Sequence, residues 1–176
     1  VCSSDLEAYI EQGYNIIFGT TFGYIDAMAE MAEEYPDVIF LHCSGYLNND
    51  TNFANYFGKM YQPRYLSGLA AGAMTDSNKI GYVAAFPIPE VIRGINAFAA
   101  GVNEVNPDAT VEVVWTFTWF GPEAETQAAN ALLETGADVL AQHQDSAATG
   151  LAAEAAGAKW ISYNTAYGQE IGRAHV

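Results

Sequence analysis

Two short segments carry the side chains whose chemistry could serve a function. The segment TFTWFGPEAETQ, residues 116–127, places two large rings, Trp119 and Phe120, directly before a Gly-Pro turn and an alanine-rich helix. The segment QHQDS, residues 142–146, collects amide, imidazole and carboxylate groups. Aromatic faces stack on planar ligands for about 1–3 kcal/mol per ring, and the polar groups supply donors and acceptors for a heterocycle or a sugar hydroxyl. The residues therefore indicate a ligand site.

Catalytic, metal and cofactor sites are not indicated. Cys43 and His143 could be drawn as a nucleophile and its base, but they lie in different halves of the chain without an evident third orienting group. Paired acids such as Glu123 and Glu125 fall on an acidic helix face, which is typical of solvated charges. The glycines of GTTFG and CSG match neither a dinucleotide fingerprint nor a phosphate loop. We expect no catalytic residue, no cofactor and no metal.

Composition limits the class of protein. The 176 residues, 51% of them apolar, are enough for one ordinary domain or two small lobes. Six basic against 21 acidic residues give a formal charge of −15, which repels phosphate backbones and argues against nucleic acid as a partner. The scarcity of lysine and arginine suits an extracytoplasmic or high-salt setting, although a solvated acidic face explains it equally well.

The first part of the chain predicts a βαβ unit. Residues 14–21 form a short apolar run typical of a buried strand, and residues 37–45 form another. Between them, residues 23–37 have helical spacing and end at a proline. Its apolar positions are Ile25, Met28, Ala29, Ala32 and Tyr35. Parallel strands in such a unit are expected to be buried on both faces. A further short strand is expected near residues 53–57.

The second part predicts a doubly wound sheet. Residues 64–78 read as a helix whose Gly68, Ala71 and Gly72 permit close packing against another backbone. Strands are expected in residues 79–86, 110–119, 137–146 and 159–166, and helices in residues 89–108, 122–136 and 147–157. Four strands that alternate with three helices make a complete small α/β unit.

The domain organisation follows from these elements. We expect residues 7–77 to form part of a first α/β lobe, residues 78–170 most of a second, and residues 75–79 a hinge. The ends, residues 1–6 and 171–176, lack the periodicity of the rest and look like translated sequencing-adaptor sequence, so we exclude them from the fold. The fold class is α/β with two doubly wound parallel-sheet lobes, incomplete at both ends. Ligands bind such folds at the carboxyl ends of the strands.

The aromatic residues near these strand ends admit two interpretations. Trp119 and Phe120 either stack on a ligand or fill the core beneath a loop. Phe22 and Tyr24, in the first lobe, could face them across a ligand. Tyr24 could instead simply begin the helix that follows it.

The polar segment admits alternatives as well. Alternation along a strand end would point Gln142 and Gln144 one way and His143 and Asp145 the other. Asp145 could contact a ligand, cap the next helix, or do both. His143 alone is more often a structural histidine than a ligand contact.

Four longer segments carry a likeness to a known family. They are FGTTFGYIDAMAEMAEEYPDVIF at residues 18–40, residues 61–115 from YQPRY to VVW, TWFGPEAE at 118–125, and ADVLAQHQDS at 137–146. They resemble the basic membrane protein family of solute-binding lipoproteins that serve ABC importers. The most specific motif is GYVAAFPIPEVIRGINAF followed by NPD. The resemblance spans nearly all of the chain between its two unusual ends.

The resemblance implies a periplasmic-binding-protein-like fold of type I, with two lobes joined by a hinge that close on a ligand. It implies a purine base or purine nucleoside as the ligand and an ABC permease in the membrane as the partner. It further implies an extracytoplasmic location, in the periplasm or as a membrane-anchored lipoprotein, and no catalysis. The family's first strand, and strands that complete both lobes, would then lie outside these residues.

The resemblance also implies roles for single residues. Trp119 matches the aromatic residue that stacks on the purine, and Asp145, followed by Gln144, matches the polar loop that contacts base or ribose. Phe86 stands where nucleoside-binding relatives commonly carry a smaller or polar contact. The segment YNTA places Asn164 and Ala166 at two positions that are acidic in the family. Loss of an acid removes a partner for ribose hydroxyls, which favours a base over a nucleoside.

Other classes of protein remain open at this point. A ligand-sensing domain of a receptor or transcription regulator shares the fold, and a nucleoside-processing hydrolase is a weaker alternative. A sugar or another small heterocycle could replace the purine.

Overall fold

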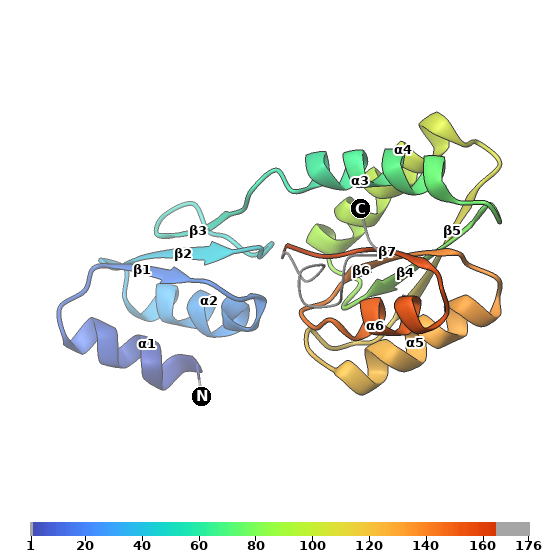
Figure 1. Ribbon diagram of the computed structural model, residues 1–176. Coiled ribbons are helices and arrows are strands. Elements are labelled where there is room, and N and C mark those ends of the chain that lie inside the picture. Colours follow the sequence, from blue (N-terminus) through green and yellow to red (C-terminus); the bar gives the residue numbers. More distant parts are fainter. Residues whose placement is uncertain (1, 165–176) are drawn as a thin grey trace. The chain divides into compact units, whose positions relative to one another are not determined.

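The structure, a computed structural model, describes residues 2–164 and divides the chain into two compact units, Val1–Lys59 and Met60–Val176 (Figure 1). Each unit is a parallel β-sheet with helices packed against it. The predicted α/β class is confirmed.

The first unit is built around three strands. Its elements are α1 (Cys2–Glu11), β1 (Ile16–Gly19), a 3-10 turn (Phe22–Tyr24), α2 (Ile25–Glu34), β2 (Ile39–Cys43) and β3 (Phe53–Tyr56). The strands pair in the order β1-β2-β3, all parallel, which confirms the predicted βαβ unit and the short third strand. Residues 2–6, excluded from the fold at the sequence level, lie in α1, and Leu6 is buried.

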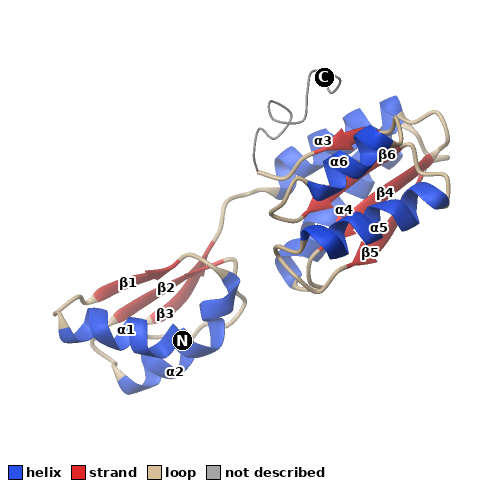
Figure 2. Ribbon diagram, turned by 60° about the horizontal axis from the view of Figure 1, so that its bottom comes forward, coloured by secondary structure: helices blue, strands red, loops and turns tan. Residues whose placement is uncertain are grey.

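The core of this unit lies between the sheet and its two helices, which cover the same face of the sheet (Figure 2). The expected positions Ile25, Met28 and Ala32 of α2 are buried, and Ala29 and Tyr35 are partly buried. Met31, which the sequence analysis left out of this face, is buried as well, because the helix presents a wide apolar stripe.

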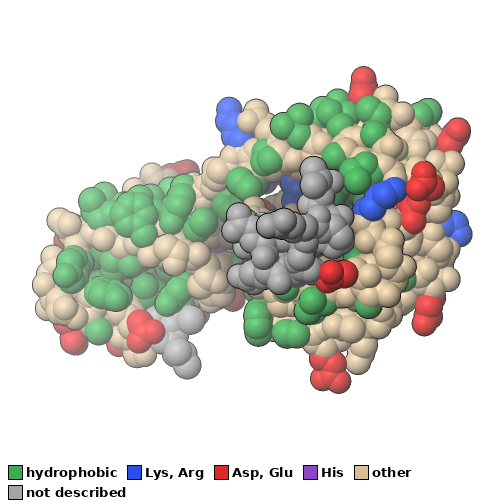
Figure 3. All heavy atoms as spheres, in the orientation of Figure 1, with side chains coloured by type: hydrophobic (Ala, Val, Ile, Leu, Met, Phe, Trp, Pro, Cys, Tyr) green, Lys and Arg blue, Asp and Glu red, His purple; other side chains and the backbone are tan. Residues whose placement is uncertain are grey.

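The opposite face of this sheet differs from the expectation that both faces are buried. Ile16, Phe18, Ile39 and Tyr56 are exposed, whereas Ile17 between them is buried. Figure 3 shows hydrophobic side chains gathered over these strands. The reason is that, within residues 2–59, helices lie against one face only.

The second unit is a doubly wound sheet. Its elements are α3 (Tyr61–Met74), β4 (Lys79–Ala84), α4 (Pro89–Val105), β5 (Thr110–Trp115), α5 (Pro122–Glu134), β6 (Val139–His143), α6 (Ala148–Ala155) and β7 (Lys159–Ile161). The strand order β5-β4-β6-β7 is entirely parallel. α3 and α4 cover one face and α5 and α6 the other (Figures 1 and 2). The predicted alternation of strands and helices is confirmed.

The two faces of this sheet have separate cores. Tyr82 and Phe98 lie at the centre of the core beneath α3 and α4, with their ring centroids 5.3 Å apart. Leu132, Leu140 and Trp160 lie in the core beneath α5 and α6. Successive residues along a strand alternate between these two cores, as Val139, Leu140 and Ala141 of β6 do, because side chains of a pleated strand point to opposite faces.

Helix α3 belongs to the second unit. The structure divides the chain between Lys59 and Met60, before α3, whereas the sequence analysis placed the boundary after this helix, between residues 77 and 78. The physical reason is that α3 packs along α4, where Gly68 and Gly101 let the two backbones meet: a Cβ at Gly68 would collide with the carbonyl oxygen of Phe98. The close packing predicted for Gly68 is confirmed.

The segment expected to be a hinge is held inside the second unit by one carboxylate. Asp138 accepts hydrogen bonds from Thr75 Oγ1 at 2.6 Å, from the backbone N–H of Asp76 at 2.7 Å and from that of Ser77 at 2.9 Å. Burial alone would raise the pKa of Asp138, but these hydrogen bonds together lower it. Three hydrogen bonds therefore tie the loop between α3 and β4 to Asp138, directly before β6.

Strand β5 is shorter than expected. It ends at Trp115, whereas the sequence analysis extended it to Trp119. Phe117 has φ of 55°, which takes the backbone out of the extended region and ends the regular strand. Residues 116–121 are consequently a loop between β5 and α5, and Trp119 and Phe120 are loop residues.

Candidate ligand-binding site

The carboxyl ends of three neighbouring strands bring together the main residues predicted for the site. Phe86 follows β4, Trp119 follows β5, and Asp145 follows β6. The ring centroid of Trp119 lies 5.5 Å from that of Phe86 and 6.2 Å from that of His143. The backbone N–H of Asp145 donates to the carbonyl oxygen of Trp119 at 2.9 Å, so the two loops are joined directly.

The aromatic group at this edge is partly core and partly surface. Trp119 is half-buried and packs against the core beneath α3 and α4. Phe120 is 66% exposed and Phe117 is 64% exposed, with the Phe117 ring 6.4 Å from Phe86. The sequence analysis missed Phe117 because it assigned that residue to a regular strand.

Gln144 supplies a buried polar group beside these rings. Its side chain is fully buried, and its Nε2 donates to the hydroxyl of Thr116. Its Oε1 has no hydrogen-bond partner among residues 2–164. A buried amide oxygen without a donor is costly, so this atom is suited to accept a hydrogen bond from a bound molecule.

Asp145 is exposed at the same edge. The pKa of its carboxyl group is raised, mainly by partial desolvation. The nearby His143 lowers this pKa, and Glu90 raises it further. At the start of α6 the backbone N–H of Ala148 donates to the hydroxyl of Ser146 at 3.2 Å, so the neighbour of Asp145 supplies the cap at that N–H. Asp145 thus remains a candidate for ligand contact.

A buried pair of titratable groups lies behind the loops. His143 is 1% exposed, and its Nε2 lies 3.0 Å from Oε1 of Glu90, which is 8% exposed. The ring centroid of Tyr163 lies 4.2 Å from that of His143. Burial lowers the pKa of His143, an effect that Glu90 opposes and Arg64 reinforces. The view of His143 as a structural histidine fits these contacts.

Arg64 of α3 completes this buried layer. Its guanidinium lies 4.7 Å from the ring centroid of Tyr163 and 5.6 Å from that of Tyr82, and its Nη2 donates to the carbonyl oxygen of Gln142 at 2.8 Å. Burial raises the pKa of Tyr82 to about 12, and it also raises that of Tyr163. The cation–π contacts fix the ring of Tyr163 against the end of β6.

Gln142 faces the other side of the sheet from His143. Its Oε1 accepts from Trp160 Nε1 at 3.0 Å, and its Nε2 donates to the carbonyl oxygen of Ser146 at 2.7 Å. The predicted alternation is therefore confirmed for Gln142 and His143. Gln142 holds the turn after β6 in place and is not part of the aromatic group.

Two candidates lie in the first unit. Phe22 is half-buried, and its ring centroid is 6.2 Å from that of Tyr46. The fully buried His42 supports this loop, with its Nε2 2.9 Å from the carbonyl oxygen of Thr21. Tyr24 packs on the core of the unit and immediately precedes α2. The alternative that Tyr24 simply begins the helix is the one that the structure favours.

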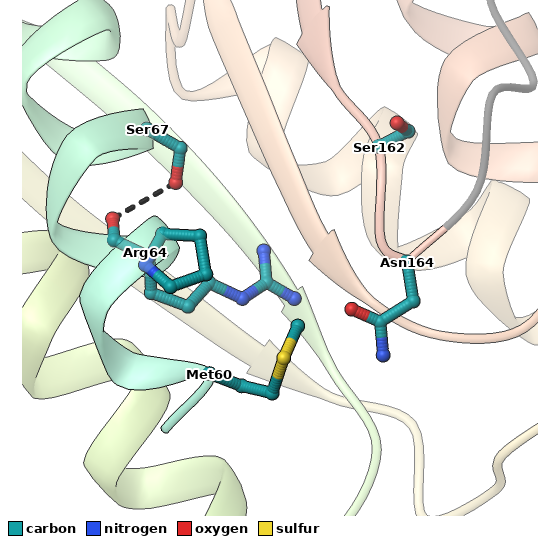
Figure 4. A pocket seen from close by; sticks show the side chains of 6 residues that line it. Met60, Arg64, Ser67, Ser162 and Asn164 are labelled. Atoms are coloured by element: carbon teal, nitrogen blue, oxygen red, sulfur yellow. Dashed lines mark hydrogen bonds between the residues drawn. The ribbon is translucent and has the colours of Figure 1, made fainter. Parts of the chain in front are cut away.

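Asn164 follows β7 and is exposed, with φ of 50°. It lines a cavity of about 310 Å³ together with residues of α3 and the end of β7 (Figure 4). The other lining residues are Met60, Pro63, Arg64, Ser67 and Ser162. Ala166, the second altered position of the YNTA segment, lies outside the described residues.

The sequence analysis missed Arg64, Glu90 and Tyr163. A weak signal existed, because Arg64 and Glu90 are charged residues in otherwise apolar stretches of helices that pack on the sheet. Tyr163 carried no distinguishing signal, since its role comes from its ring contacts with Arg64 and His143.

The fold and the loops at its strand ends define a periplasmic-binding-protein-like α/β protein. A solute-binding protein of an ABC transporter system from Conexibacter woesei is similar in structure, with a TM-score of 0.61 and 25% identity over 90% of this chain and 54% of that chain. Residues 2–167 match the family model for ABC transporter substrate-binding proteins of the PnrA-like type (Bmp). The chain belongs to this family, which confirms the resemblance seen in the sequence.

Two curated relatives are similar over much of the chain. A putative ABC transporter glucose-binding protein of Haloferax volcanii is 52% identical over 163 residues, which cover 93% of this chain and 41% of the relative. A purine-binding protein of Brucella abortus is 43% identical over 136 residues, which cover 77% of this chain and 39% of the relative. The chain thus spans about two fifths of the length of these relatives. Within residues 2–164, no helix is long and apolar enough to cross a membrane.

Proposed function

We propose that this protein is the solute-binding component of an ABC importer, which captures a purine base, adenine-like, or a purine nucleoside and passes it to a permease in the membrane. The observation that carries the proposal is the half-buried Trp119 packed beside Phe86, with the free acceptor of Gln144 and the exposed Asp145 on the adjoining loop. Membership of a substrate-binding family and the purine-binding relative support it.

The chemistry of these groups suits a purine. The half-buried indole of Trp119 offers a stacking surface for the bicyclic ring. The Gln144 Oε1 and the Asp145 carboxylate are acceptors, and a purine base presents ring N–H or exocyclic amino donors to them. Phe86 and Phe120 add apolar surface. A site built from such acceptors discriminates strongly against ligands that leave them unpaired.

We further propose that a free base is preferred over its nucleoside. Asn164 stands at a position where the resemblance implies an acid, and a neutral amide is a weaker acceptor for ribose hydroxyls than a carboxylate. The importer role includes an extracytoplasmic location, in the periplasm or on a lipid anchor, with the permease as partner. The binding role requires no catalytic residue and no cofactor.

Glucose is the second candidate, because the Haloferax volcanii relative is named for it. The first experiment is a thermal-shift screen of the chain against adenine, guanine, hypoxanthine, their nucleosides and glucose, followed by calorimetric titration of each hit. Stabilisation by a base, and less by its nucleoside, is the expected result. A shift with glucose alone, or with no purine, would overturn the purine assignment and leave the family membership unaffected.

Trp119 provides the sharper test. Replacement by Leu keeps the residue apolar but removes the aromatic face, and it should weaken purine binding by about 1–3 kcal/mol, or roughly five- to 150-fold. Trp119→Phe retains a ring and is the matched control, with a smaller loss expected. Calorimetric dissociation constants of the two variants make the comparison. Equal affinities of Trp119→Leu and the parent chain would refute the stacking role.

A further inference from the structure

A cavity in the second unit is separate from the Trp119 loop. It lies between the first turns of α3 and the segment after β7, with a volume of about 310 Å³ (Figure 4). The Arg64 guanidinium points into it from α3, and the Asn164 amide approaches from the opposite side. Met60 and Pro63 contribute apolar wall.

Arg64 brings a charge that the described residues do not pair. Its side chain is 6% exposed, and its hydrogen bond from Nη2 to the Gln142 carbonyl uses one of the five N–H groups of a guanidinium. Within residues 2–164, the ion pair is Lys159 with Asp76, and the buried His143 lies 3.0 Å from Glu90; neither contact includes Arg64. The nearby carboxylate of Glu90 is engaged with His143.

We propose that this cavity binds the carboxylate of a small organic acid. A guanidinium fork binds a carboxylate with two parallel charge-assisted hydrogen bonds, and a buried arginine is the side chain best suited to this. The Asn164 amide can donate a further hydrogen bond to the same group. Met60 and Pro63 receive the apolar body of the acid. The cavity volume admits an acid the size of benzoate.

This site shares Asn164 with the proposed preference for a base over a nucleoside, but it does not rest on purine stacking. Its charged group is Arg64 on α3, whereas the purine is proposed to stack on Trp119 after β5. A chain of ring contacts joins the two places: Tyr163 lies against both Arg64 and His143, and His143 lies against Trp119. The bases and nucleosides of the purine screen carry no carboxylate, so the two proposals can fail separately.

The test uses benzoate and its neutral counterpart benzamide. The sequence holds three arginines, Arg64, Arg93 and Arg173, so few arginine Nε–H signals have to be assigned in an NMR spectrum. Benzoate should shift the Arg64 Nε–H signal saturably, and benzamide should bind about ten-fold more weakly, equivalent to 1.4 kcal/mol. The absence of a saturable shift, or equal affinity for the two compounds, would overturn the proposal.

Two variants make the assignment specific. Asn164→Asp places a carboxylate beside Arg64 and should weaken benzoate binding about ten-fold, whereas Asn103→Asp adds the same charge on an exposed part of α4 and should not. Arg64→Lys keeps the charge but loses the fork, and it should also weaken benzoate binding. Circular dichroism checks that each variant is folded. Equal effects of Asn164→Asp and Asn103→Asp would refute the site.

Discussion

The buried pair of Glu90 and His143 sets the electrostatics behind the Trp119 loop. Removing either group from water is costly, and their 3.0 Å contact offsets part of that cost. Because burial lowers the pKa of His143, the imidazole is neutral in the folded protein over a wider pH range than in the unfolded chain. Glu90, Arg64 and Asp145 all act on this ring, so its protonation state is linked to the stability of the second unit.

The sign of this linkage gives a prediction. Below the ordinary histidine pKa of about 6.5, the unfolded chain binds a proton at His143 and the folded chain does not. The free energy of unfolding therefore falls as the pH drops toward the lowered pKa, by up to about 1.4 kcal/mol per pH unit. Urea unfolding at pH 7.5 and 5.5, followed by tryptophan fluorescence, measures this fall in the free energy of unfolding. The signal reports on the second unit, because that unit contains Trp115, Trp119 and Trp160.

The control for this prediction is His143→Gln, which does not titrate. Its free energy of unfolding should depend less on pH over the same range than that of the parent chain. If the free energy of unfolding falls by the same amount in both proteins between the two pH values, the linkage is assigned to the wrong residue.

At the residue scale, the sequence indicates side chains that stand at strand ends and misses those that support them. Trp119, Phe86 and Asp145 follow strands directly, and parallel topology brings such positions together. Arg64 lies on a helix that precedes β4, and its contact with Tyr163 joins residues 99 positions apart. Pairings of this kind depend on how α3 packs, which residue types alone do not specify.

At the scale of elements, the contact between α3 and α4 depends on glycines. A Cβ at Gly101 would collide with the carbonyl oxygen of Tyr65 and lie 2.9 Å from the backbone nitrogen of Leu69. A Cβ added at Gly94 of the same helix would lie 3.6 Å from its nearest atoms, which belong to the His143 ring. This distance is an ordinary van der Waals contact. The two glycines thus differ in what a methyl group would meet.

This difference gives a prediction with its control in one helix. Gly101→Ala forces the two backbones apart and should lower the free energy of unfolding of the second unit by about 1–3 kcal/mol. Gly94→Ala should be neutral or stabilising by up to about 1 kcal/mol, because alanine has the higher helix propensity. Urea unfolding followed by tryptophan fluorescence compares them. Equal stability of the two variants would mean that the helices can move apart without cost.

The order of the elements was predictable, and their ends were less so. Buried parallel strands give continuous apolar runs, and Pro89 and Gly136 mark a helix start and a helix end. The end of β5 was not predictable, since Thr-Phe-Thr-Trp has high strand propensity and only the positive φ of Phe117 ends the strand. Local preference was overridden there by the loop that carries Trp119.

At the scale of the whole molecule, the two units have separate cores. The core of the first unit, around Met28 and Phe40, shares no residue with the cores around Phe98 and Leu132 in the second. The sequence could not place the unit boundary, because the helix α3 follows the strands of the first unit without a linker of distinct composition. Its assignment depends on the packing of Gly68 and Gly101.

Separate cores predict separate responses to core mutation. Phe40 is fully buried, and Phe40→Ala should cost about 3–5 kcal/mol. Amide hydrogen exchange should then accelerate in β1, β2 and β3, while β4 and β6 keep their protection, because local opening follows the loss of local burial. Leu140→Ala, at an equally buried position of β6, should give the opposite pattern. Faster exchange in both units for either variant would show that the chain unfolds as one cooperative body.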